Sequence, residues 1–174
     1  MRDALRRLLF SVDKEFHPPL SARRTPVDLT LTPLPTASAD PPGEPWSYWR
    51  GVAQQSGVVL AEGDEPLGFL AFRPAEHLPT LGRTVAAHVT TIVVRHDRRG
   101  HRPAGRIYGH LLRLLATTPG ASVATRTWTA NTPHLHVLAR LRFAEVHRIL
   151  DARGPGQDTI YFERLAADPP REGP

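Results

Sequence analysis

The transition from strand to helix between residues 89 and 115 constrains the fold of this chain more than any other stretch. A β-branched run, Val89-Thr-Thr-Ile-Val-Val94, predicts a strand, and residues 107–115 have the apolar spacing of a helix. The loop between them is rich in glycine and arginine. Free backbone N–H groups and the positive end of the helix dipole meet at a helix N-terminus, so this loop is expected to bind a phosphorylated ligand. It lacks the Gly-Lys-Ser/Thr of a P-loop and the three spaced glycines of a dinucleotide-binding loop.

Five arginines surround the predicted phosphate loop, and guanidinium groups bind phosphate through paired, charge-assisted hydrogen bonds. The alternative interpretation is an exposed basic turn. The flanking strand and helix favour phosphate binding. The five residues are Arg95, Arg98, Arg99, Arg102 and Arg106.

The rest of the chain predicts one mixed α/β domain, with two helices followed by elements in the order β-β-β-α-β-α-β-β. Residues 30–45 are rich in proline and polar residues and predict a surface loop or flap, and the residues after Ala167 predict a disordered tail. The expected helices are 3–16, 46–55, 104–117 and 132–141, and the expected strands are 58–62, 67–72, 85–94, 122–129, 143–150 and 159–164.

The composition excludes several kinds of site and argues against a membrane protein. The 174 residues contain no cysteine, which excludes disulfides, thiolate metal sites and a cysteine nucleophile, and the nine histidines have no metal-ligand spacing. No apolar run approaches the ~20 residues of a membrane span, and the N-terminus lacks the pattern of a signal peptide, so we expect a cytoplasmic protein without a membrane partner. The net charge is +5, but the arginines are spread along the chain, which does not favour a nucleic-acid partner.

Three blocks of residues carry a resemblance to a known family. Arg99-Gly-His-Arg-Pro-Ala104 is similar to a pyrophosphate loop of the form Arg/Gln-x-x-Gly-x-Gly/Ala, and Trp128-Thr-Ala-Asn131 with Leu141-Arg-Phe143 is similar to the strand and helix that follow it. The segments 153–162 and 13–23 resemble the closing hairpin and the opening helix of a small bacterial subgroup. In this order and spacing, the blocks resemble the GCN5-related N-acetyltransferases (the GNAT superfamily), which transfer an acetyl group from acetyl-coenzyme A to an amine.

The resemblance implies an α/β fold of the α+β kind, with a mixed, mostly antiparallel sheet that is splayed at the cofactor site and flanked by helices. Residues 1–167 would form a single N-acetyltransferase domain, with acceptor-side helices and the Pro-rich loop in 1–56, an acyl-CoA-binding core in 57–167, and a tail in 168–174. The implied co-substrate is acetyl-CoA without a metal, and the implied acceptor is an amine of a small molecule or peptide. A homodimer is left open.

The family's cofactor contacts fall on two stretches of this chain. The main chain of Ile92, Val93 and Val94 would bind the pantetheine as an added strand would, and an N–H near Ile92 would polarise the thioester carbonyl. Asn131 would contact the pantetheine amide, cap the last helix, or do both. The residues implied to bind the pyrophosphate are Arg99, Gly100, His101, Arg102, Ala104 and Gly105.

Two histidines are the catalytic candidates. His88 is placed by strand alternation on the same face as Thr90 and Ile92, where it would act as the base toward the attacking amine. The alternative is a hydrogen-bonded strand histidine. The family's general-acid tyrosine falls on Leu138, so His134, one helical turn earlier, would donate to the departing thiolate, or it is a surface residue.

Departures from the family pattern support a second function. The central glycine of the loop is Arg102, followed by Pro103, which has no N–H, and the glycine before Phe143 is Arg142. With Leu138, these changes favour a catalytically degenerate acyl-CoA-binding or partner-binding protein of the same fold. The basic charge alone supports a third option, a nucleic-acid-associated acetyltransferase. The residues predicted to wall the acceptor site, or to pack in the core, are Asp13, Phe16, Trp46 and Trp49.

Overall fold

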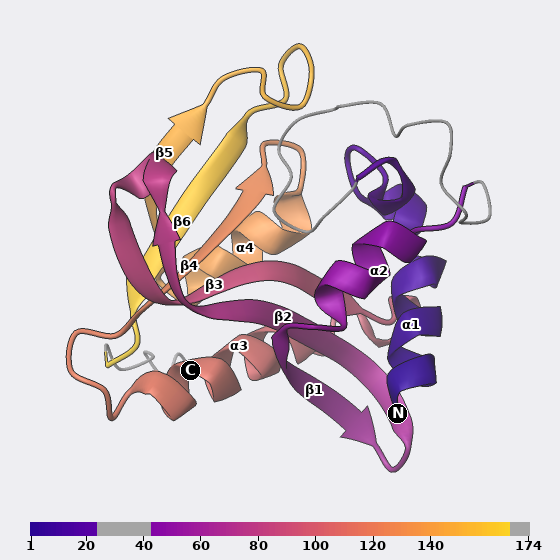
Figure 1. The fold of residues 1–174 in the computed structure, drawn as a ribbon. Helices are drawn as coiled ribbons and strands as arrows, with labels where there is room; N and C mark the ends of the chain where they lie inside the picture. Colours follow the sequence, from indigo (N-terminus) through magenta and orange to yellow (C-terminus); the bar gives the residue numbers. More distant parts are fainter. Residues whose placement is uncertain (24–42, 168–174) are drawn as a thin grey trace.

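A six-stranded sheet organises the protein, which is described here from a computed structural model covering residues 1–23 and 43–167. The strand order is β1-β2-β3-β4-β6-β5 (Figure 1). The strands are β1 (Ser56–Glu62), β2 (Glu65–Leu78), β3 (Arg83–Val94), β4 (Ser122–Trp128), β5 (Ala144–Ile149) and β6 (Thr159–Leu165). The helices are α1 (Arg2–Ser11), α2 (Trp46–Val52), α3 (Pro103–Leu115) and α4 (Thr132–Arg140).

The sheet is antiparallel except where β3 meets β4. These two strands pair in parallel over only three residues each, Ala87–Val89 and Val123–Thr125. Beyond that point β3 continues to Val94 and β4 to Trp128 without further pairing between them. The mixed, mostly antiparallel and splayed sheet expected from the sequence is confirmed.

A bulge in β3 changes which side chains share a face. Val89 pairs with Phe72 and Thr91 pairs with Ala71, so Thr90 is an extra residue between them. Val89 and Ile92 therefore pack on the α3 side of the sheet, whereas Thr91 bonds to Tyr48 of α2 on the other side. His88 precedes the bulge and faces away from Val89, so it does not share a face with Ile92. The predicted face of His88 is wrong because strand alternation does not survive a bulge.

Each face of the sheet carries its own core. On one face, α3 and α4 bury Ile107, Tyr108 and Leu138 against Leu70 and Val89. On the other face, α1, α2 and the short 3-10 helix Leu20–Ala22 form a core with β2 and β3 (Figure 1). The most buried members of this core are Leu9, Leu20, Tyr48 and Val93. The cleft described below lies where β3 and β4 separate.

The predicted elements are confirmed in number, order and type. The opening helix, expected over residues 3–16, ends at Ser11 and is followed by a 3-10 helix at Asp13–Glu15. In α2, Trp49 and Val52 are buried. Most of the Pro-rich stretch 30–45 and the tail 168–174 lie outside the described residues. No helix within 1–23 and 43–167 is long and apolar enough to cross a membrane.

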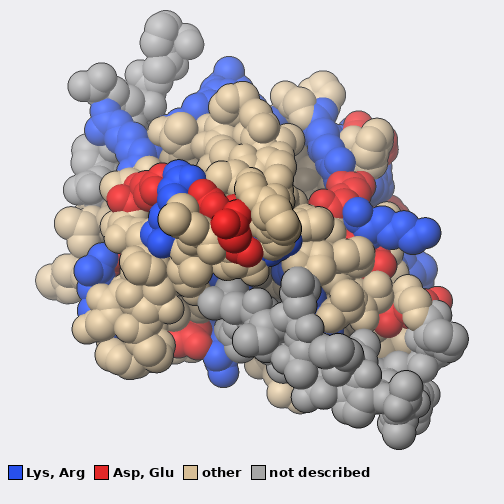
Figure 2. All heavy atoms as spheres, turned by 90° about the horizontal axis from the view of Figure 1, so that it is seen from above, with Lys and Arg blue, Asp and Glu red and all other residues tan. Residues whose placement is uncertain are grey.

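Charged side chains are dispersed over the surface. On the face seen in Figure 2, Lys and Arg side chains are scattered and interleaved with Asp and Glu. This agrees with the even spread of arginine along the sequence, and no single basic patch dominates this view.

Candidate functional site

A cleft of about 1740 Å³ opens where β3 and β4 separate. Its walls come from β1 and β3, from the loop between β3 and α3, and from α3 itself. They also come from β4, from α4 along its length, and from the segment that follows α1. Because β4 has diverged, no strand within residues 1–23 and 43–167 pairs with this edge of β3 beyond Val89. The cleft therefore brings a free strand edge and a helix N-terminus to one space.

The free edge of β3 exposes particular peptide groups. The N–H of Arg95 donates to Leu67 O at 2.9 Å. Gly68 and Val94, which lie opposite each other between these two residues, therefore form a non-hydrogen-bonded pair of the antiparallel ladder. The N–H and C=O groups of such a pair point away from the partner strand. By alternation, the N–H and C=O groups of Ile92 and Val94 point into the cleft. Those of Val93 point toward β2. The main-chain contact predicted for Val93 is thus corrected, and the geometry retains Ile92 and Val94.

The loop enters α3 through two left-handed residues. Gly100 has φ +88°, and Arg102, which caps α3, has φ 60° and ψ 27°. Arg102 thus adopts the conformation that the glycine of the resembling loop favours. Pro103 is the first helical residue, where its missing N–H removes no helix bond. The N–H groups of Ala104 and Gly105, in the first turn of the helix, remain at the cleft wall.

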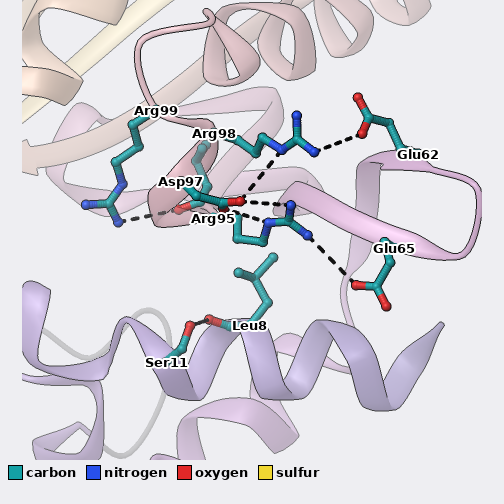
Figure 3. A network of polar contacts seen from close by, with 9 residues as sticks. Leu8, Ser11, Glu62, Glu65, Arg95, Asp97, Arg98 and Arg99 are labelled. Carbon is teal, nitrogen blue, oxygen red and sulfur yellow. Dashed lines mark hydrogen bonds and ion pairs between the residues drawn. The ribbon is translucent and has the colours of Figure 1, made fainter.

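The five arginines of the predicted phosphate loop divide into two groups. Arg95 bonds to Asp97 at 2.7 Å, and Arg98 lies 3.2 Å from Glu62, so both are held by carboxylates beside the β1–β2 turn (Figure 3). Neither lines the cleft. The three that do are Arg99, Arg102 and Arg106.

Arg99 also connects the loop to the N-terminal segment. Its guanidinium forms an ion pair with Glu15, in the 3-10 helix after α1, and contacts Val94 O at 3.4 Å. Both partners of the ion pair are well exposed. The predicted phosphate loop is therefore tied to the segment predicted to bind the acceptor.

Nine of the ten residues predicted to bind the cofactor line the cleft. The exception is His101, which is exposed and is not part of the lining. Asn131 lines the cleft and caps α4, its side-chain oxygen accepting a 3.4 Å bond from the N–H of His134. The capping role is confirmed, and the cofactor contact stays a prediction.

His88 does not line the cleft. Its side chain is 2% exposed, its Nδ1 lies 2.8 Å from Glu76 Oε2, and its buried Nε2 has no partner among the described residues. Burial lowers the pKa of His88, with nearby Arg126 acting in the same direction and Glu76 in the opposite one. This geometry matches the hydrogen-bonded strand histidine given above as the alternative.

His134 lines the cleft and pairs with a buried tyrosine. Its Nε2 lies 3.0 Å from Tyr108 Oη, and the two rings stack at 5.9 Å. Burial lowers the pKa of His134 to about 4 and raises the pKa of Tyr108. At neutral pH the imidazole is therefore uncharged, so it donates from a neutral N–H. Leu138, one turn later, is fully buried in the core.

The bend after α4 forms without glycine. Arg142 has φ 60°, and the N–H of Phe143 donates to Leu138 O at 3.0 Å, closing the helix end. Tyr108 and Tyr161 are buried, as their predicted packing roles require.

The structure separates the four residues that were predicted to wall the acceptor site or to pack in the core. Phe16 lines the cleft, whereas Trp46 and Trp49 pack with the second core and Asp13 is bound to Ser21. Sequence reasoning missed Arg23, Arg126 and Arg153, which line the cleft with Trp128. These residues are far apart in the chain and share no motif spacing. The only available signal was that segments 13–23 and 153–162 both resembled the same subgroup.

Comparisons with known proteins identify the fold. No protein-family model and no curated protein matches the chain. An aminoglycoside 6'-N-acetyltransferase from Enterococcus faecium superposes with a TM-score of 0.62 at 14% identity, over 97% of this chain and 92% of that chain. A Desulfovibrio desulfuricans structure assigned to the GNAT family gives 0.54 at 16% identity, over 64% and 69%.

A Bacillus anthracis structure, solved in complex with acetyl coenzyme A, gives a TM-score of 0.50 at 11% identity, over 60% of this chain and 58% of that chain. At these identities the likeness concerns the backbone and not the substrate. The chain has the fold of the GCN5-related N-acetyltransferases.

Proposed function

We propose that the protein is an N-acetyltransferase that transfers the acetyl group of acetyl-CoA to an amine. The observation that carries this proposal is the splayed edge of β3, where the peptide groups of Ile92 and Val94 face the same cleft as the N-terminus of α3. A pantetheine chain has amides that would pair with a free strand edge. A pyrophosphate would fit the exposed N–H groups at a helix start.

In this proposal the loop holds the diphosphate. The N–H groups of Ala104 and Gly105 donate to it, and the guanidinium groups of Arg99 and Arg102 supply charge where Pro103 offers no donor. Asn131 contacts the pantetheine from the opposite wall. The acetyl-CoA complex of the Bacillus anthracis structure supports the cofactor class.

Bound acetyl-CoA supplies an activated thioester carbon. The N–H of Ile92 polarises its carbonyl, the amine nitrogen bonds to that carbon, and the carbon–sulfur bond breaks. The amine proton passes to water. His134 stabilises the leaving sulfur by donating from Nδ1, in the tautomer in which Tyr108 Oη donates to its Nε2. His88 is not assigned as the base, because its ring lies outside the cleft lining and its lowered pKa weakens it as a proton acceptor.

The experiment measures release of free CoA thiol from acetyl-CoA over a panel of small and peptide amines, with thermal unfolding followed in acetyl-CoA, propionyl-CoA and free CoA. Both thiol release and a rise in Tm are expected, since a ligand of the folded state stabilises it by mass action. Stabilisation without transfer to any amine would favour the degenerate acyl-CoA-binding protein. No stabilisation at millimolar CoA would contradict both functions.

A further inference from the structure

Three arginines from separate parts of the chain line the cleft. Arg126 lies on β4, Arg23 follows the 3-10 helix after Pro19, and Arg153 lies in the loop between β5 and β6. We call Arg23, Arg126 and Arg153 the arginine cluster. None of its members belongs to the phosphate loop, and the three come from different segments of the chain.

Arg153 is held in place by several contacts. It is 8% exposed, its Nε donates to Thr159 Oγ1 at 3.0 Å, and its Nη1 donates to His17 O. Its guanidinium carbon lies 5.0 Å from the centre of the Trp128 ring. The plane of this buried cation is therefore fixed by hydrogen bonds and by an aromatic face.

Arg23, in the N-terminal segment, is also held by hydrogen bonds and by an aromatic ring. Its Nε and Nη2 donate to Pro18 O at 3.0 and 2.8 Å, and its guanidinium carbon lies 5.6 Å from the centre of the Phe16 ring. The Phe16 and Trp128 rings are themselves 6.1 Å apart. The two rings thus stand between two oriented guanidinium groups, and all four side chains line the cleft.

The cluster is electrostatically strained. Burial lowers the pKa of Arg153 to about 9, and Arg23 and Arg126 lower it further. Burial lowers the pKa of Arg23 also, and Arg126 adds to that effect, although Tyr48 and Asp13 oppose it. Among the described residues that line the cleft, ten are Lys or Arg and one, Glu15, is a carboxylate. An anion entering the cleft would relieve this repulsion.

We propose that the arginine cluster binds a carboxylate of the acceptor, so that the amine to be acetylated belongs to an amino acid or an acidic peptide. Planar guanidinium groups bind carboxylates through parallel N–H···O bonds, and a partly buried site strengthens such bonds. Phe16 and Trp128 would contact the apolar part of the same molecule. The proposal rests on the proposed acetyl transfer.

The test compares pairs of amines that differ in one anionic group, a carboxylate or a phosphate. Each amino acid of a panel is assayed against its α-carboxamide, and phosphoethanolamine is assayed against ethanolamine. Loss of a charge-assisted pair corresponds to a roughly 10- to 100-fold fall in kcat/KM, so the carboxylates are expected to exceed the amides by about this factor. Equal rates, or a preference for the phosphorylated amine, would overturn the proposal.

Variants locate the effect in the cluster. Arg126→Gln is the primary variant. Arg126 is half-buried, so its replacement should destabilise the fold less than replacement of the buried Arg153. Arg126→Gln should abolish the preference for carboxylates, measured in the variant as the ratio of kcat/KM for each amino acid to kcat/KM for its amide. Arg126→Lys should restore part of the preference, and Arg7→Gln, an exposed arginine on α1, controls for loss of net charge. An unchanged preference in Arg126→Gln would remove the cluster from acceptor binding.

A binding readout separates this inference from the proposed function. N-acetyl amino acids and their amides are titrated into the CoA-saturated protein by calorimetry. If N-acetyl amino acids bind more tightly than their amides, and Arg126→Gln loses this difference, binding of a carboxylate by the arginine cluster is supported even if no amine is acetylated. Equal binding of both forms contradicts the cluster even if amines are acetylated.

Discussion

Two arginines, Arg102 and Arg142, have the left-handed backbone conformation that glycine adopts most readily. Each stands at a turn that shapes the cleft, one before α3 and one after α4. The turns form in spite of the side chain, so a local departure from a glycine pattern did not alter the fold. The energetic penalty of a left-handed residue is about 1–2 kcal/mol, which the surrounding structure must offset.

Arg142→Gly is expected to stabilise the protein by about 0.5 kcal/mol, because relief of the left-handed backbone exceeds the added entropy of glycine in the unfolded chain. Arg140→Gly is the matched control, since Arg140 is right-handed at the end of α4 and should lose up to about 1 kcal/mol. Urea unfolding measures both. A destabilised Arg142→Gly would show that contacts of the Arg142 side chain contribute more to stability than relief of the left-handed backbone.

Protonation of His134 is expected to destabilise the fold in acid. Its pKa is lowered from 6.5 to about 4 by burial, so the unfolded chain binds a proton near pH 6.5 that the folded protein does not bind until about pH 4. Stability is therefore fully present above pH 6.5 and falls as the pH decreases from 6.5 toward 4. The lowered pKa of His88 acts in the same direction.

Urea unfolding at pH 7 and pH 5 tests this dependence. In His134→Gln the loss of stability between the two pH values should be smaller than in the wild type, whereas His136→Gln, an exposed neighbour on α4, should leave it unchanged. An unaltered pH dependence in His134→Gln would show that the ring is solvated in the folded state.

At the scale of elements, the bulge at Thr90 and the short parallel contact of β3 with β4 create the cleft. Helix spacing and turn residues predicted the α-helices and strands of the described residues, because those signals are local. The bulge could not be predicted, since Thr90 is as β-branched as its neighbours and only pairing with Ala71 and Phe72 reveals it. The faces assigned to His88 and Ile92 by simple alternation were therefore wrong relative to each other.

Gly68→Ala is expected to destabilise the β2–β3 pair beside the cleft. A Cβ at this position would lie 2.7 Å from Val93 O and 3.3 Å from Val94 Cα, and backbone atoms cannot move aside cheaply. We expect a loss of about 1–3 kcal/mol in urea unfolding, with weaker binding of CoA because β3 shifts.

Gly109→Ala controls for the added methyl group. Its Cβ would meet only the end of the Arg113 side chain at 3.5 Å, and alanine favours a helix interior, so stability should be unchanged or increased. Equal stability of Gly68→Ala and wild type would mean that the strand pair is looser than its geometry indicates.

The ion pair between Arg99 and Glu15 is expected to compete with the cofactor. Because Arg99 must leave Glu15 to bind a phosphate, Glu15→Gln should tighten CoA binding. An exposed pair contributes about 0.2–1 kcal/mol, so the gain is roughly 1.5- to 5-fold. Calorimetric titration with CoA measures it. Glu65→Gln, whose carboxylate lies 3.9 Å from Arg95 outside the cleft, should have no effect. Weaker binding in Glu15→Gln would indicate that the pair holds Arg99 in place for the ligand.

At the scale of the whole molecule, the site joins segments that the sequence keeps far apart. The phosphate loop could be predicted because its strand, turn and helix are contiguous. The arginine cluster could not, because Arg23 and Arg153 meet only when the N-terminal segment packs on the β5–β6 loop, where His17 Nε2 lies 2.9 Å from Arg153 O. The outward turn of Arg95 and Arg98 likewise depends on Glu62 and Glu65 of a distant hairpin.

A crystal structure of the protein with CoA would show whether the splayed cleft binds acetyl-CoA. Pantetheine density is expected along β3, with its amides bonded to the peptide groups of Ile92 and Val94. The diphosphate should lie at Ala104 and Gly105, and Arg99 should be separated from Glu15. CoA bound at another surface, or a cleft without density in crystals grown at millimolar CoA, would contradict binding of acetyl-CoA in this cleft.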